Sequence, residues 1–480
     1  MTSTHAATSH GTQSHGSRGA GHGGALALLA FAQLIYSLDI NIVFVALPDI
    51  GRGLHFSGQT QQWVVSAYMV LCGGFLLFGG RAADLIGQRR MFIFALGLYA
   101  VSSLAGGLAR TPEIIVAARA VQGIGAAFLF PATLSLINRL FAEGPERNRA
   151  LAIWGGAGAS GLTIGALAGG FLTAAFGWPA VFYVNVLLAG IAMIAAFTVI
   201  PRDPKRHEHR NFDVPGALTV TAGATLLVFA LVQGPEFGWG APVIIWSFVL
   251  SAIFLVAFAV IEAKSRDPLM PVRLLGNGSL VAGMTITFLY MGTFGALPYF
   301  LTVLFQTVQG FSALQTGLAF LVPSFAIVAG TQAGEKLATR ISTKATLIVG
   351  MVLGAVGTAL LVPGTGVETA YVVIVPGLIL SGIGQGIVWT GMWIAAASGV
   401  HHDEQGVVSG MASTTLSVGN AIGLAVLIAI ANGHAAGLEN VARAAATAEG
   451  IKLAFWLAAA GIVVSLLVAF ALPGKARTQN

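Results

Sequence analysis

The sequence predicts an all-α integral membrane protein of about fourteen transmembrane helices, arranged as two pseudo-symmetric six-helix bundles plus an inserted helix pair. Only 9% of the 480 residues are charged and 56% are hydrophobic, whereas soluble domains carry roughly 25% charged residues. Apolar stretches long enough to cross a bilayer recur along the chain. The 63 glycines also favour a membrane bundle, because small residues let helices approach closely there.

Fourteen apolar spans account for nearly the whole chain, and each is long enough for a helix that crosses the hydrocarbon core. The expected spans are 25 to 47, 62 to 80, 91 to 108, 113 to 136, 149 to 174, 178 to 200, 214 to 233, 241 to 262, 279 to 304, 314 to 334, 345 to 363, 370 to 397, 406 to 431 and 452 to 472.

The spans divide the chain into five segments. Residues 1–24 are rich in Gly, Ser, Thr and His, and we expect a disordered cytoplasmic tail because this composition buries too little apolar surface to fold. Residues 25–200 are expected to form the N-terminal six-helix bundle, and residues 276–472 the C-terminal six-helix bundle. Residues 201–275 form a linker with inserted helices 7 and 8, and residues 473–480 a cytoplasmic tail.

The basic residues indicate the orientation of the chain. With cytoplasmic termini, 19 of the 24 Lys and Arg residues fall on the cytoplasmic side and Arg119 lies within a span; the four on the outside are Arg52, Arg110, Arg443 and Lys452. Cytoplasmic loops of membrane proteins carry such an excess of positive charge. Because topology explains the net charge of +6, no nucleic-acid partner is expected.

Catalytic and metal chemistry are not expected. Cys72 is the single cysteine, so no internal disulfide can form, and no group of cysteine and histidine residues has the spacing of a zinc site. No span carries a set of His, Asp and Glu side chains suited to catalysis. The sequence therefore predicts no cofactor and no enzyme.

Two glycine-containing segments recur at nearly equal offsets. The loop after the second span begins at Gly80, and a degenerate copy begins at Gly334, 254 residues later. The Gly-Ile-Gly sequence of residues 123–125 recurs 259 residues later, at residues 382–384. These offsets predict duplicated halves, an arrangement typical of secondary transporters.

Asp39 is the only carboxylate deep within an expected span. An ionised carboxylate at the centre of a bilayer costs about 2.5–3.5 kcal/mol on insertion scales, so a partner is required. Arg119 can be that partner, because both residues lie about 10–12 Å from the outer ends of their helices at a rise of 1.5 Å per residue. If both face a cavity, a change in hydration or spacing can switch the proton occupancy of Asp39. The alternative is a fixed structural ion pair.

Polar and aromatic side chains on neighbouring spans are candidates for a substrate cavity. The candidates are Asn41, Tyr68, Gln122, Trp389 and Trp393. Gln122 lies one helical turn from Arg119, so it can face the same way. Trp389 and Trp393 lie four residues apart near the middle of a span, away from the interfaces where tryptophan usually collects. Ordinary packing is the alternative for each aromatic residue, although pockets for drug-like ligands have this apolar and aromatic composition.

The loop GRAADLIGQRR at residues 80–90 resembles the signature loop between helices 2 and 3 of the major facilitator superfamily. The segment from Arg119 to Ala127 is similar to the superfamily's helix 4 motif linked to proton coupling. Leu38 and Asp39, followed by Val-Ala-Leu-Pro at residues 45–48, resemble the helix 1 motif of its fourteen-helix drug:proton antiporter branch. The likeness covers residues 25–472.

The resemblance implies a proton-coupled multidrug efflux transporter that exports small apolar or monocationic compounds by alternating access, with Asp39 and Arg119 in proton coupling. It also implies a cytoplasmic gate, whose expected residues are Gly80, Arg81, Asp84, Gly87, Arg89 and Arg90. Asp84 can accept hydrogen bonds from a helix N-terminus or an arginine where the two bundles meet. A topogenic basic loop would explain the arginines of this segment but not Asp84.

The fifth span departs from the family pattern. Family exporters carry a Gly-Pro pair here, whereas Ala166 stands where proline is expected, and this weakens the implied direction of transport. Small residues of this spacing are expected to pack closely against another helix. The glycines concerned are Gly161, Gly165, Gly169 and Gly170.

Two alternatives remain open: a dedicated metabolite exporter or importer of the same superfamily, and a membrane sensor without transport. The chain has no soluble output domain that a sensor would use. The expected partners are a small-molecule substrate, protons and the lipid bilayer. We expect a monomer in the bacterial inner membrane with both termini in the cytoplasm.

Overall fold

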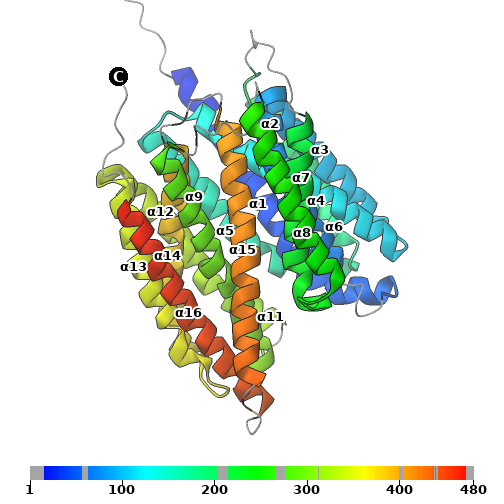
Figure 1. The fold of residues 1–480 in the computed structure, drawn as a ribbon, viewed down its shortest axis with the longest axis vertical. Coiled ribbons are helices and arrows are strands. Elements are labelled where there is room, and N and C mark those ends of the chain that lie inside the picture. Colours follow the sequence, from blue (N-terminus) through cyan, green and yellow to red (C-terminus); the bar gives the residue numbers. More distant parts are fainter. Residues whose placement is uncertain are drawn as a thin grey trace, which may run out of the picture.

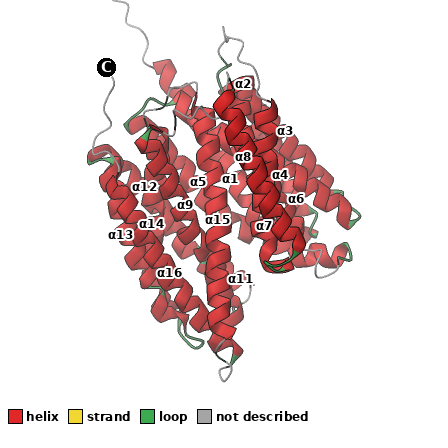
Figure 2. Ribbon diagram, viewed as in Figure 1, coloured by secondary structure: helices red, strands yellow, loops and turns green. Residues whose placement is uncertain are grey.

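The structure, a computed structural model, describes residues 16–56, 63–203, 214–265, 274, 276–311, 313–398, 400, 404–436, 438 and 442–471. It is a bundle of long helices joined by short loops, and no strand occurs among these residues (Figures 1 and 2). Fourteen helical segments of the described chain are long and apolar enough to cross a membrane. The expected fold class is confirmed.

Six helices make up the first half. They are α1 (Gly16–Gly53), α2 (Trp63–Ile86), α3 (Gln88–Gly107), α4 (Pro112–Leu140), α5 (Pro145–Phe176) and α6 (Ala180–Val199). Proline at the first position starts α4 and α5, where a missing N–H leaves no hydrogen bond unmade. Helix α1 begins at Gly16 rather than at residue 25, so residues 16–24, which were expected in the tail, continue the helix beyond its apolar part.

Two helices connect the halves, α7 (Val214–Phe237) and α8 (Pro242–Lys264). Helix α7 packs on α2 and on α15 (Gln405–Ala436) of the second half, and α8 packs on α7. Figure 1 shows this pair in green in front of the first half. A glycine pair of α2, Gly73 and Gly74, lets α7 approach, since a Cβ on Gly74 would lie 2.9 Å from the Cα atom of Thr225.

The second half begins with an irregular span. Helix α9 (Gly278–Thr293) continues through a 3₁₀ turn (Phe294–Ala296), α10 (Leu297–Val303) and a π-helical turn (Leu304–Val308). Pro298 explains the first break, because proline has no N–H to bond the carbonyl one turn earlier. Hydropathy alone predicts one regular helix here.

Six further helices complete the second half. They are α11 (Ala313–Ala319), α12 (Leu321–Arg340), α13 (Thr343–Ala359), α14 (Tyr371–Ala397) and α16 (Arg443–Ala471), together with α15. Helices α11 and α12 form one span, from Gln315 to Arg340.

The helix pairs of the two halves repeat. In the first half α1 packs on α5 and α6, α4 on α2 and α3, and α3 on α6. In the second half α9 packs on α15 and α16, α14 on α12 and α13, and α13 on α16. The helices at the same positions in each half therefore make the same pairs.

The halves meet along two seams. Helix α2 packs on α15 at one seam and α5 on α12 at the other, while α4 reaches α15 and α5 reaches α14 between them. With fourteen spans, α1 begins and α16 ends at the same end of the bundle (Figure 1). We call this the inner end; the loop between α2 and α3 lies there.

Candidate functional site

Asp39 lies inside the first half, on α1, and is fully buried. Its Oδ2 atom accepts a hydrogen bond from Arg119 of α4 at 2.7 Å. Its Oδ1 atom accepts from Gln122 Nε2 at 3.0 Å and from Asn185 Nδ2 of α6 at 2.6 Å. Two helices, α4 and α6, thus supply the donors that compensate a carboxylate removed from water.

Arg119 has partners besides Asp39. Its Nε donates to the carbonyl oxygen of Val64 at 3.0 Å, and its Nη1 also donates to Gln122 Oε1 at 2.7 Å. Its guanidinium carbon lies 4.3 Å from the ring centroid of Tyr68, a cation–π contact. Gln122 Nε2 also bonds Ser103 on α3 at 2.9 Å. These neutral groups can hold the arginine charge independently of the carboxylate.

The sequence places Asp39 and Arg119 at a common depth, and the structure joins them. Tyr68 and Gln122, which the sequence suggests as cavity residues, surround this pair within the first half, while Asn41 is half-buried on α1. Asn185 is a direct partner that sequence reasoning did not single out. Its signal was an amide eight residues into an otherwise apolar span, where a polar side chain needs a partner.

Glycines of α5 bring α1 close at the level of Asp39. A Cβ on Gly161 would lie 2.6 Å from the carbonyl oxygen of Leu34, one on Gly165 2.4 Å from that of Leu38, and one on Gly169 2.9 Å from that of Ile42. Any side chain at these three positions would push the helices apart.

Gly170 does not share this contact. It is exposed, and no atom of another helix in the described part of the chain lies within 4 Å of the position of a Cβ there. The packing expected for Gly170 is therefore wrong, because consecutive helical residues point about 100° apart and only every fourth residue of this segment, at positions 161, 165 and 169, faces α1.

At the inner end, Asp84 of α2 caps the first turn of α15. Its Oδ1 accepts from the backbone N–H of Gly406 at 2.9 Å, and its Oδ2 from that of Val407 at 2.8 Å. Gly80, one turn earlier, permits the crossing, because a Cβ there would lie 2.3 Å from the carbonyl oxygen of Gly406 and 2.7 Å from the Cα atom of Gly410. A carboxylate of one half thus neutralises the positive end of a helix dipole in the other.

The C-terminal part of the signature loop, from Gly87 to Arg90, contacts the segment after α6. The backbone N–H groups of Arg89 and Arg90 donate to the two carboxylate oxygens of Asp203 at 3.0 and 3.1 Å, and Arg139 of α4 adds an ion pair at 2.8 Å. Gly87 turns the chain at φ 114°, and a Cβ there would lie 2.4 Å from the Asp203 carboxylate. Asp203 therefore caps α3 and ties the loop to the segment after α6.

Arg81, also expected at the gate, is buried on α2 with 4% of its surface exposed. Sequence reasoning did not single out Asp203. Its signal was a lone carboxylate in the basic segment Pro-Arg-Asp-Pro-Lys-Arg that follows the sixth span.

The degenerate copy of the loop forms the other seam, between α12 and α5. Ala338 occupies the position that corresponds to Asp84, and the N-cap residue of α5 is Gly144, which has no side chain that could cap the helix. A hydrogen bond from Asn148 Nδ2 to Thr339 Oγ1, 3.3 Å long, bridges the halves there.

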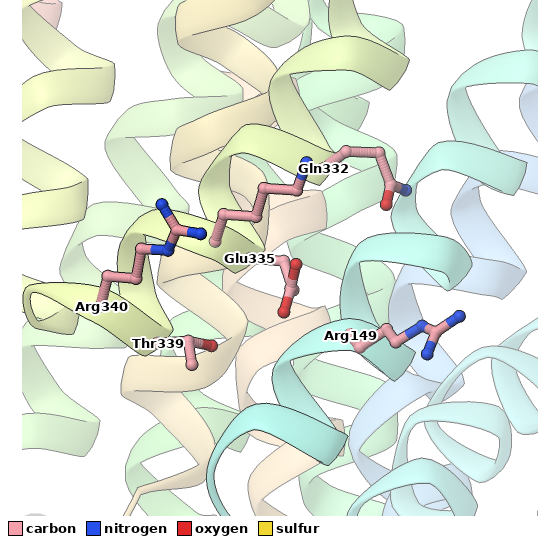
Figure 3. Close-up of a pocket in the computed structure, with 6 residues that line it drawn as sticks. Arg149, Gln332, Glu335, Thr339 and Arg340 are labelled. Carbon is pink, nitrogen blue, oxygen red and sulfur yellow. The ribbon is translucent and has the colours of Figure 1, made fainter.

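A cavity of about 480 Å³ remains beside this contact; its lining residues are Arg149, Gln332, Glu335, Lys336, Thr339 and Arg340. Figure 3 shows Glu335 on α12, with the guanidinium of Arg149 turned away from it. The α2–α15 seam is thus closed by a charged cap, whereas the α5–α12 seam leaves space at the same end.

Between the halves lies an aromatic cluster. Trp389 and Trp393 of α14 have ring centroids 5.7 Å apart, and Trp154 of α5 lies 6.0 Å from Trp389 and 5.8 Å from Trp393. We call these three residues the tryptophan cluster. Phe130 of α4 lies 5.3 Å from Trp154, and Tyr290 of α9 lies 5.6 Å from Trp389. Trp154 is the member that sequence reasoning missed, since a single tryptophan within a glycine-rich span carries no pattern.

No group of three or more His, Cys, Asp and Glu side chains that could hold a metal ion occurs in the described part of the chain.

Comparison with known proteins identifies a matching family and similar sequences. The sequence model of the Major Facilitator Superfamily matches residues 29–424. The chain is 35% identical over 456 residues to the puromycin resistance protein pur8 of Streptomyces alboniger, covering 93% of this chain and 89% of that protein. It is 36% identical over 421 residues to the cephamycin export protein CmcT of Amycolatopsis lactamdurans, covering 86% of each.

A solved structure shares the fold. The human organic anion transporter MFSD10 superposes with a TM-score of 0.68 at 16% sequence identity, covering 93% of this chain and 99% of that chain. With the paired halves, the buried ion pair and the signature loop, these matches lead to one conclusion: the chain belongs to the major facilitator superfamily.

Proposed function

We propose that the protein exports small, largely apolar, antibiotic-like compounds from a bacterial cytoplasm in exchange for protons. The inner end faces the cytoplasm, and the two halves alternately expose a substrate site between them. The similarity to a puromycin resistance protein and a cephamycin export protein supports export of such compounds. The observation that supports proton coupling is the buried carboxylate of Asp39, which pairs with Arg119.

Asp39 can exist in two charge states in its site. Ionised, it accepts three hydrogen bonds, from Arg119, Gln122 and Asn185. Protonated, it loses its charge attraction for Arg119, but the arginine keeps the Val64 carbonyl and the Tyr68 ring. Removing one partner of a buried ion pair normally costs about 3–5 kcal/mol, and these neutral partners reduce that cost.

The helix that carries those neutral partners also closes the inner end. Val64 and Tyr68 lie on α2, and so do Gly80 and Asp84, which contact α15. When Asp39 takes up a proton, Arg119 shifts its interactions toward α2. This shift changes the equilibrium between the closed and the open form of the α2–α15 seam. A proton bound within the first half thereby changes the relation between the halves.

Transport in inside-out membrane vesicles tests this function. An acid-inside pH gradient should drive uptake of antibiotics such as puromycin into vesicles that contain the protein, and collapse of the gradient should stop it. Empty vesicles give the passive background. Uptake that does not depend on the pH gradient, across a panel of unrelated compounds, would contradict proton-driven export.

A dedicated exporter of one metabolite is the second candidate. The two relatives above are named for one antibiotic each, which favours a narrow substrate range. Uptake of the same panel of unrelated compounds separates the two candidate functions, because a dedicated carrier should take up one compound class only.

A further inference from the structure

Three indole N–H groups meet where the halves join. The Nε1 atoms of Trp154, Trp389 and Trp393 are all buried, and none has a hydrogen-bond partner among the residues that the structure describes. Trp154 is 0% and Trp393 1% exposed. An indole N–H can only donate, and a buried tryptophan usually finds an acceptor, so three unpaired donors in one cluster require an explanation.

The cluster is built by close approach of the halves. Gly155 follows Trp154 on α5, and a Cβ there would lie 2.4 Å from Cδ1 and 2.5 Å from Nε1 of Trp389 on α14. The sequence therefore keeps a glycine where the tryptophan of the opposite half must fit. The Trp154 and Trp389 rings are stacked at 20°, and Trp393 meets both nearly edge-on, at 85° and 78°.

The neighbouring side chains offer rings rather than charges. Phe130 lies 5.9 Å from Trp393, and Tyr36 lies 5.0 Å from Phe130. Tyr290 lies next to Trp389 and adds a further aromatic ring to this group. A ligand between these rings would meet aromatic faces for stacking and indole N–H groups as donors.

We propose that the tryptophan cluster binds aromatic compounds that carry a hydrogen-bond acceptor, such as a ring carbonyl, through the indole N–H groups of Trp154, Trp389 and Trp393. This proposal rests on the proposed function, because a ligand reaches the cluster only when α5 and α14 separate. A cation would gain contacts with the ring faces but would leave the three donors unsatisfied. The cluster therefore selects for acceptors.

Coumarin and 2H-chromene test this selection, since they share a fused two-ring frame and differ by the lactone carbonyl. Binding is measured by equilibrium dialysis of the full-length protein in detergent, with empty micelles as the partition control. Wild type should bind coumarin at least about tenfold more tightly than 2H-chromene. Each Trp→Phe substitution in the cluster keeps a ring but removes a donor. Because one carbonyl oxygen accepts at most two hydrogen bonds, at least one of the three substitutions should lower this ratio about fivefold, as expected for one hydrogen bond.

Trp246→Phe is the matched control, because Trp246 is 62% exposed on α8, away from the cluster; its ratio should equal that of wild type. Equal affinity for both probes, no binding of coumarin, or an unchanged ratio in the folded single variants overturns the proposal. The outcome is independent of transport. Selective binding without proton-driven uptake would refute the proposed function alone, and uptake without selectivity would refute this inference alone.

Discussion

Asp84→Asn should loosen the inner end. The carboxylate accepts from two backbone N–H groups of the opposite half, at 2.9 and 2.8 Å. An asparagine keeps one acceptor but turns an NH₂ group toward the second N–H, and it loses the charge that favours a helix N-terminus. The loss is about 1.5–3 kcal/mol, and since the contact exists only when the halves meet here, the open form should gain about 10- to 150-fold.

Double electron–electron resonance, which measures distances between spin labels, can detect this gain in the open form. Spin labels at Glu143 and Arg340 lie on exposed sites of opposite halves near the inner end, in a Cys72→Ala background that removes the single native thiol. The longer-distance population should grow in Asp84→Asn and stay at the wild-type level in Glu146→Gln, whose exposed carboxylate contacts its own half. Identical distance distributions in Asp84→Asn and wild type would refute the assignment of this contact as a gate.

Three further outcomes are expected. Asp203→Ala removes the cap of α3 and the partner of Arg139, so transport should fall several-fold while purified protein remains folded; undiminished transport would show that the loop needs no such anchor. Gly165→Val should lower the midpoint of thermal unfolding, since even a Cβ would lie 2.4 Å from a carbonyl oxygen of α1, whereas Gly170→Val should leave it unchanged; equal midpoints would contradict the α1–α5 packing. A thiol at position 90 should be labelled only from the cytoplasm and one at position 110 only from outside, and the reverse pattern would overturn the orientation.

Features that depend on length and hydropathy could be predicted from the sequence. The fourteen spans are such features, because about 20 apolar residues are needed wherever a helix crosses a bilayer. The irregular span through Pro298 was not predicted, since a break within an apolar segment leaves its mean hydropathy unchanged.

The Asp39–Arg119 pair could be predicted because a buried charge of each sign requires a partner at the same depth. Asn185 could not be assigned to this pair in the same way, because a neutral amide is tolerated at many depths and its helical face depends on the packing of α6 on α1. Trp154 illustrates the same limit, since its neighbours come from the other half of the chain.

The cap by Asp84 lies between these cases. A carboxylate in a basic loop suggests a helix N-terminus or an arginine as partner, and the structure supplies the N-terminus of α15. That Gly80 must be glycine follows only from the backbone crossing at Gly406 and Gly410. Tertiary contacts, rather than local pattern, decide such positions.

Proton-driven transport by Asp39→Asn tests the central claim most directly. The amide retains the shape of the side chain but cannot take up or release a proton. In proteoliposomes, the variant should still exchange labelled puromycin for unlabelled puromycin across the membrane, as wild type does, but should not accumulate it when a pH gradient is imposed. Accumulation by Asp39→Asn at the wild-type level would contradict the assignment of proton coupling to this carboxylate.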